Sequence, residues 1–155
     1  MNARIAGQLE RAGELHDRAM GLADEATILK LQGRQGESGL KLQGAFELER
    51  DAADLLGDAD IPEPSRSVFH RSAASLAIQV CELDEAERLI EEGLRGQPPL
   101  SIAAELKELT QAIRGRLRTS ERELGETPYE VERVAYFPKA FVLEVTASFP
   151  QPPPA

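Results

Sequence analysis

The chain has 155 residues, of which 41% are hydrophobic and 29% charged, values typical of one soluble globular domain. The excess of 27 acidic over 18 basic residues gives a net charge of −9, which opposes binding to nucleic acid and to anionic membranes. Seven aromatic residues, none of them Trp, leave Leu, Ile, Val and Ala to build the core. We therefore expect a mainly α-helical protein.

The N-terminal residues favour a cytoplasmic location. Arg4 and Glu10 lie among scattered apolar residues, without the continuous apolar run of a signal peptide. No later segment approaches the ~20 apolar residues that span a bilayer. The single cysteine, Cys81, cannot form an internal disulfide, which is typical of a reducing compartment.

Two helices are expected in the first third of the chain. Apolar residues recur seven apart from Ile5 onward, which predicts a long helix that ends near Gly33. The segment 33–36, Gly-Arg-Gln-Gly, is expected to be a tight turn. A second apolar stripe predicts a helix over 37–57, antiparallel to the first.

Three more helices are predicted after the Pro-containing loop at 58–64. Ser65 or Ser67 is suited to cap a third helix, which ends near Val80. Asp84 and Glu87 have the spacing of a capping box and open a fourth, which Gly96 and two prolines close. A fifth begins at Ser101 and is bounded by Gly125 and Pro128; its apolar stripe comprises Ile102, Leu106, Leu109, Ile113 and Leu117.

The pattern changes to a period of two after residue 127. Apolar residues alternate with others over 141–149, which predicts a half-buried strand that pairs with 131–137 as a short β-hairpin, the alternative being an extended tail. The Pro-rich end is expected to be disordered. We thus divide the chain into a helical repeat domain (1–126), an aromatic-rich β-like tail (127–149) and a disordered end (150–155).

A shift of 48 residues aligns the first two helices with the next two. Small residues meet small ones, as at Ala26 and Ala74, and Gly33 meets Cys81. The small residue of the first helix, the turn Gly, the acidic residue opening the second helix and a later Ala resemble the tetratricopeptide repeat over roughly residues 20–100. This resemblance implies stacked helical hairpins, with helix five as a cap, that bind another protein on a concave face.

The resemblance also indicates where a protein partner would bind. The candidate groove residues are Lys30, Arg34, Arg71, Ser75 and Gln79. Separately from the resemblance, the aromatic-rich pattern of the tail indicates Tyr136, Phe137, Phe141 and Phe149 as candidate contact residues. The basic and Asn residues with which some members bind a C-terminal carboxylate are not evident, because the corresponding positions hold Ala23 and Thr27 in one unit and Arg71 and Ser75 in the other.

Enzymatic chemistry is not expected. His16 and His70 lack a second His or Cys at three- or four-residue spacing, so no zinc site is predicted. Cys81 is interpreted as a turn residue, and Gly33 to Gly36 lack the Lys-Ser/Thr of a phosphate loop. We predict no enzymatic activity, cofactor or metal.

Three interpretations stay open from the sequence. The leading one is a protein-binding scaffold or adaptor. The second is a homo-oligomer assembled through the tail, which either packs on its own helices or adds to a sheet edge of a partner. The third, from size and charge, is a small acidic neutralising, antitoxin-like subunit. A basic group on helix five either complements the negative end of its helix or contacts an acidic partner; it comprises Arg114, Arg116, Arg118 and Arg122.

Overall fold

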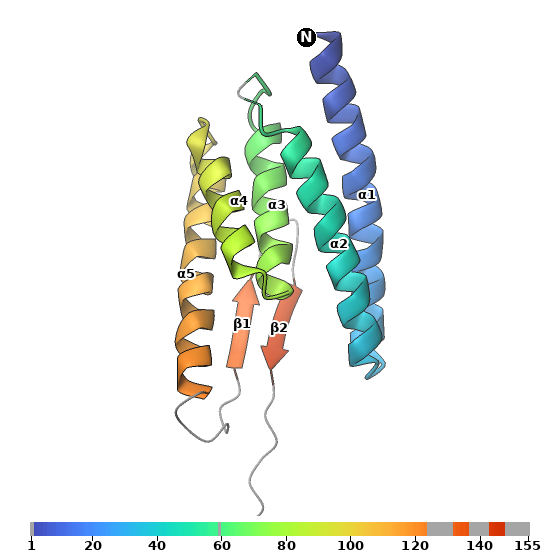
Figure 1. Ribbon diagram of the computed structural model, residues 1–155, viewed down its shortest axis with the longest axis vertical. Coiled ribbons are helices and arrows are strands. Elements are labelled where there is room, and N and C mark those ends of the chain that lie inside the picture. Colours follow the sequence, from blue (N-terminus) through green and yellow to red (C-terminus); the bar gives the residue numbers. More distant parts are fainter. Residues whose placement is uncertain (1, 59, 124–131, 137–142, 148–155) are drawn as a thin grey trace, which may run out of the picture.

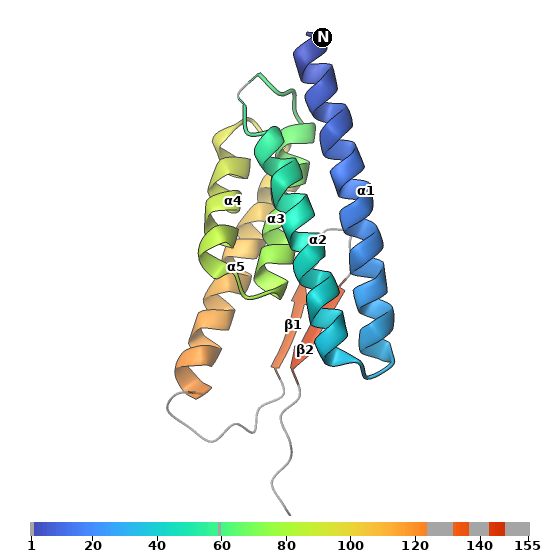
Figure 2. The same ribbon diagram turned by 45° about the vertical axis from the view of Figure 1, so that its right-hand side comes forward.

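Five helices in a row form the body of the protein. A computed structural model describes residues 2–58, 60–123, 132–136 and 143–147, with side chains described as far as residue 121. The helices are α1 (Ala3–Leu31), α2 (Gln35–Leu55), α3 (Ser65–Gln79), α4 (Leu83–Arg95) and α5 (Leu100–Glu123). Each packs on the next, and α5 also contacts α3. Figures 1 and 2 show α1 at one edge of the row. The prediction of a mainly α fold with packed adjacent helix pairs is confirmed.

The turns between α1 and α2 and between α3 and α4 have the same hydrogen bonds. The amide of Arg34 donates to Leu29 O at 2.9 Å, and the amide of Glu82 donates to Ala77 O at 2.9 Å. These bonds define a Schellman motif, in which the residue after the helix takes a left-handed conformation. That residue is Gly33 (φ 78°) in the first turn and Cys81 (φ 64°) in the second. The two turns are 48 residues apart, the shift at which the sequence aligns with itself.

The helix α3 lies at the centre of the core. Eleven of its 15 residues are buried, because α2, α4 and α5 all pack on it. Small residues make this possible: Ala73, Ala74 and Ala77 are each 0% exposed. On α4, a Cβ added at Gly93 would lie 3.0 Å from a methyl group of Leu106 and 3.1 Å from His70 Cβ, so Gly93 permits the close approach of α3, α4 and α5.

The predicted caps of two helices are wrong. Pro64 stands at the N-cap of α3, where Glu63 accepts from both the amide and the hydroxyl of Ser67, at 3.1 and 2.6 Å. The chain thus uses a carboxylate in place of a serine hydroxyl. The N-cap of α4 is Glu82, without a side-chain cap hydrogen bond, so Asp84 lies inside the helix. Carboxylates in its first turn still favour the helix through its dipole.

Two short strands follow the helices. The strands β1 (Glu132–Tyr136) and β2 (Leu143–Ala147) pair antiparallel, with Val134 opposite Val145, and β1 contacts α5. The remainder of the predicted tail, including Phe137, Phe141 and Phe149, lies outside the described residues.

Candidate partner-binding face on α3 and α5

Three of the predicted groove residues share one side of α3. Arg71, Ser75 and Gln79 are spaced four apart, so they follow one another along the helix. The side-chain Nε2 of Gln79 donates to the backbone carbonyl oxygen of Ser75 at 3.5 Å. Ser75 is 1% exposed and Arg71 is 9% exposed, whereas Gln79 is half-buried. These three residues therefore form a buried polar line, not an open basic surface.

An ion pair connects this line to α5. Arg71 Nη1 donates to Glu105 Oε2 at 2.6 Å, and the side chains of the pair are only 10% and 24% exposed. Farther along α5, Arg116 Nη1 lies 3.7 Å from Sγ of Cys81, in the turn that follows α3. Since both contacts advance in the same direction along the chain, α3 and α5 run parallel, as the first helices of stacked hairpins do.

Buried donor atoms without acceptors occur along both α3 and α5. Arg71 Nε, Ser72 Oγ, Ser75 Oγ, Arg116 Nε and Arg116 Nη2 are buried, and no acceptor for them exists among the described residues. A buried donor left unsatisfied costs about 1–3 kcal/mol, so these five atoms are unusual. Arg66 Nε and Nη1, near the start of α3, are also buried without an acceptor in the described part of the chain.

The other two predicted groove residues lie elsewhere. Arg34 is in the turn between α1 and α2, where its Nε donates to Glu37 Oε1 at 2.7 Å. This contact lowers the pKa of Glu37. Lys30 is half-buried in the last turn of α1. The structure thus brings Arg71, Ser75 and Gln79 together and leaves these two at the turn of the other hairpin. Of the tail candidates, Tyr136 ends β1.

The sequence analysis missed two residues of the face. Glu105 is one of 27 acids, and its pairing with Arg71 joins positions 34 residues apart, so no local pattern indicated it. Ser72 begins the Ser-Ala-Ala-Ser run, whose small residues indicated tight packing but not an unsatisfied hydroxyl. Arg116 was singled out only as one of a basic group, without its contact to Cys81.

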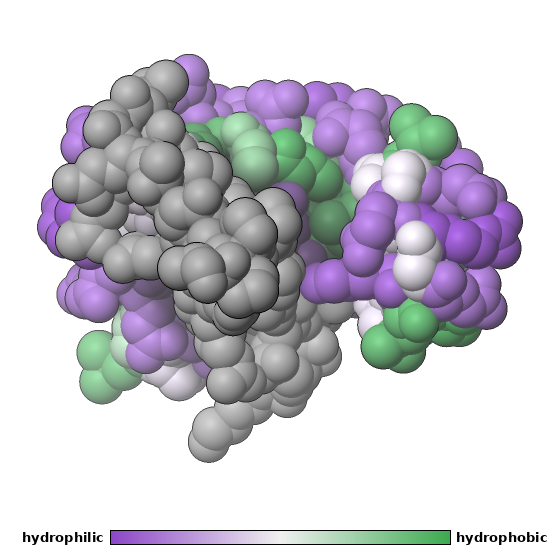
Figure 3. Space-filling view, turned by 90° about the horizontal axis from the view of Figure 1, so that it is seen from below, coloured by the Kyte–Doolittle hydropathy of each residue, from purple (hydrophilic) through white to green (hydrophobic). Residues whose placement is uncertain are grey.

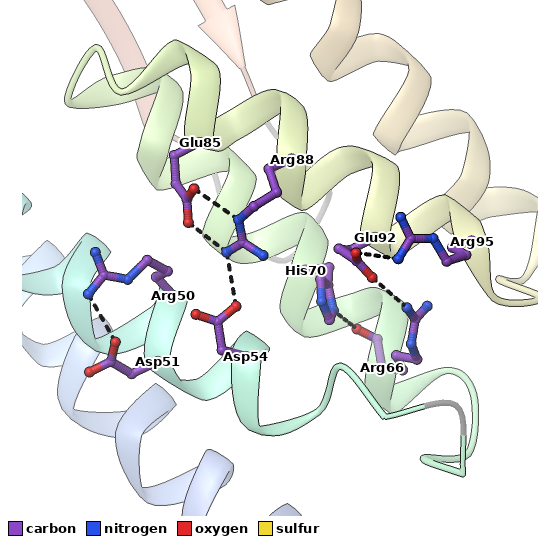
Figure 4. Close-up of polar contacts among 9 residues, drawn as sticks. All are labelled: Arg50, Asp51, Asp54, Arg66, His70, Glu85, Arg88, Glu92 and Arg95. Carbon is purple, nitrogen blue, oxygen red and sulfur yellow. Dashed lines mark hydrogen bonds and ion pairs between the residues drawn. The ribbon is translucent and has the colours of Figure 1, made fainter.

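An ion pair near the start of α3 joins this helix to α4. Arg66 and Arg95 both contact Glu92 of α4, at 3.3 and 2.5 Å (Figure 4). His70 Nδ1 donates to Arg66 O at 2.8 Å, and burial lowers the pKa of His70. The hydrogen bond to Arg66 O opposes this shift, but burial has the larger effect, which favours a neutral, structural histidine.

A further ion-pair group joins α2 to α4. Arg88 donates to Asp54 at 2.9 Å and to Glu85 at 2.6 Å (Figure 4). The side chains are between 28% and 48% exposed, so solvent screens these contacts and each contributes little. They connect the second helices of the two hairpins, α2 and α4.

Large apolar side chains do not form a single patch at the α1–α2 end. Ile28, Leu31 and Leu40 are exposed there. Figure 3 shows that apolar residues at this end lie as separate groups on a mainly hydrophilic surface. The polar face on α3 and α5 is therefore a better candidate for partner binding than these isolated side chains.

Metal-ligand clusters and membrane-spanning helices are both absent from the described part of the chain. Within the described residues, no three His, Cys, Asp or Glu side chains are grouped as metal ligands would be. None of the helices in that part of the chain is both long and apolar enough to cross a bilayer. Comparisons with protein-family models, curated proteins and solved structures found no match to this chain.

Proposed function

We propose that the chain is a non-enzymatic protein-binding module, built like a tetratricopeptide-repeat scaffold, that holds a partner segment on the α3–α5 face. The observation that carries this proposal is the group of five buried donor atoms without acceptors. The repeated turn at Gly33 and Cys81 supports the likeness to stacked helical hairpins.

The chemistry of the face defines the partner. Guanidinium N–H and serine O–H groups can all donate, and the one carboxylate of the face, Glu105, is already paired with Arg71. An extended polypeptide segment with acidic side chains supplies both carboxylate and backbone carbonyl acceptors. The proposed partner is therefore an acidic segment of another protein.

A double substitution tests the proposal without breaking an ion pair. Ser72→Ala with Ser75→Ala removes two unsatisfied hydroxyls, a change that leaves folding stability unchanged or raised, because neither group has an acceptor to lose. Partners are captured from the native host by full-length protein and quantified by cross-linking and mass spectrometry. The expected result is a partner cross-linked to α3 or α5 and at least about fivefold depleted in the double variant, the loss of about 1 kcal/mol of hydrogen bonding.

Ser101→Ala is the matched control, since Ser101 is an exposed serine at the start of α5. It is expected to capture the partner as the unsubstituted chain does. Equal capture by the double variant and the control would contradict the α3–α5 face as the binding site. Partners cross-linked only to α1 or α2 would contradict it as well.

The second candidate is a homo-oligomer formed through the tail. It is favoured by the two-stranded sheet, because each strand pairs on one side only among the described strands and offers a free edge. Sedimentation equilibrium of the full chain against a chain ending at Gly125 tests it. A monomer in both cases would exclude assembly through the tail.

A further inference from the structure

The outermost helix, α1, is held mainly by one neighbour. Figures 1 and 2 show it at the edge of the row, and it packs chiefly on α2. Its buried residues are Ala12, Leu15, Ala19, Ala23 and Ala26. Four of these are alanines, which remove little apolar surface from water, so α1 gains less from burial than a Leu-rich helix would. A polar contact in the middle of this surface then carries a larger share of the docking energy.

Such a contact joins His16 to Glu49. The Glu49 side chain is 0% exposed, and both of its carboxylate oxygens lie 3.0 Å from His16 Nδ1. The His16 side chain is 34% exposed, and its ring meets Phe69 of α3 edge-on at 5.5 Å between centroids. His16 is the one hydrogen-bond partner of Glu49 recorded among the described residues. Deprotonation of His16 therefore leaves a wholly buried carboxylate facing a neutral ring.

The protonation of His16 depends on the charged groups around it on α1 and α2. The hydrogen bond to Glu49 of α2 raises the pKa of His16 above 6.5, the charge of Glu49 and that of Asp17 on α1 raise it further, and partial burial opposes them. On α3, Phe69 brings no charge. Because the folded-state pKa is raised, the stabilisation is complete below pH 6.5 and is lost as the pH rises through the folded-state pKa.

We propose that the His16–Glu49 pair is a pH-sensitive contact that loosens α1 from α2 when His16 loses its proton. A buried carboxylate without a cationic partner gains by reaching water, and local opening of an edge helix is the motion that hydrates Glu49. Most residues of the larger core cluster belong to α2, α3, α4 and α5, and α1 contributes Ala23, with Met20 and Leu22 at its edge. We therefore expect these four helices to stay folded while α1 opens. This device is independent of partner binding on the α3–α5 face.

Amide hydrogen exchange on the full chain tests the proposal. Protection factors are measured at pH 6.0 and 8.5 and corrected for the intrinsic exchange rate. A charge-assisted hydrogen bond exceeds a neutral one by an amount that corresponds to about a five- to tenfold change in an opening equilibrium. We expect α1 to lose protection by that factor at pH 8.5, while amides of α3 keep theirs.

Two substitutions and a control separate this contact from general alkaline effects. His16→Asn and Glu49→Gln each remove one partner, so α1 protection is expected to become independent of pH in both. Asp17→Asn changes an exposed charge beside His16 and keeps the pair, so it retains most of the pH dependence. Equal α1 protection at both pH values in the unsubstituted chain would overturn the proposal, and so would an unchanged pH dependence in His16→Asn.

Discussion

The residue Cys81 is predicted to store strain that a glycine would remove. Its φ of 64° lies in the left-handed region, which costs an L-amino acid about 1–2 kcal/mol, whereas Gly33 takes the same conformation at the equivalent turn freely. Glycine loses about 0.5–1 kcal/mol more backbone entropy on folding than alanine does. Cys81→Gly should therefore stabilise the fold by about 0.5–1 kcal/mol. Urea unfolding monitored by circular dichroism gives this difference, and the melting temperature should rise by roughly 1–4 °C.

A second substitution separates backbone strain from the thiol. Cys81→Ala keeps the left-handed backbone and removes the 3.7 Å contact between Cys81 Sγ and Arg116 Nη1, an exposed interaction worth little. Its stability should stay within about 0.5 kcal/mol of the unsubstituted chain. At the other turn, Gly33→Ala should destabilise by about 1 kcal/mol. If Cys81→Gly proved no more stable than Cys81→Ala, the reasoning from φ would be refuted.

Three further outcomes are expected from the core. Gly93→Ala should lower the free energy of unfolding by about 1 kcal/mol, because overpacking outweighs the gain in helix propensity. Gly39→Ala, at a helical position with open space, should raise the free energy of unfolding by about 0.5–1 kcal/mol. Urea midpoints of the two variants compare these effects. Arg71→Ala should cost about 2–4 kcal/mol by leaving Glu105 unpaired, and a double-mutant cycle with Glu105→Gln should show that the two losses are not additive. An NMR titration should place the protonation midpoint of the His70 ring below 6.5, because burial lowers its pKa; this contribution therefore weakens the fold as the pH falls through the unfolded-state value.

The helices were predictable because their information is local. A four-residue spacing of apolar residues identifies a helix wherever one face is buried, and the stripe from Ile102 to Ile113 is indeed buried against the core. The turn at Gly33 could be read from the residue itself. The turn at Cys81 could not, since cysteine has no preference for a positive φ, and only the 48-residue shift indicated it.

The caps and the candidate site depended on contacts that local patterns do not record. Two serines stand at the start of α3, yet Glu63 accepts the hydrogen bond from the Ser67 amide. The carboxylate of Glu63, four residues earlier, lies within hydrogen-bond distance of that amide. Arg71 and Ser75 were identified from their place in the repeat, but their burial follows from α5 packing alongside, with Glu105 as the ion partner. The pairing of Arg71 with Glu105, 34 residues apart, depends on how α3 and α5 are aligned against each other. No local sequence pattern indicates that alignment.

The position of α3 explains why polar groups and small residues occur together on it. A helix packed by α2, α4 and α5 must be narrow, so its sequence uses Ala and Ser where a surface helix would use Leu. Alanine would serve this packing as well as serine and without a hydroxyl to satisfy, yet Ser72 and Ser75 are both present and both lack an acceptor among the described residues. Packing alone therefore accounts for the size of these side chains but not for their polarity. The proposed acidic partner would supply the missing acceptors, and the Ser72→Ala, Ser75→Ala chain tests this, because it keeps the packing and removes the donors.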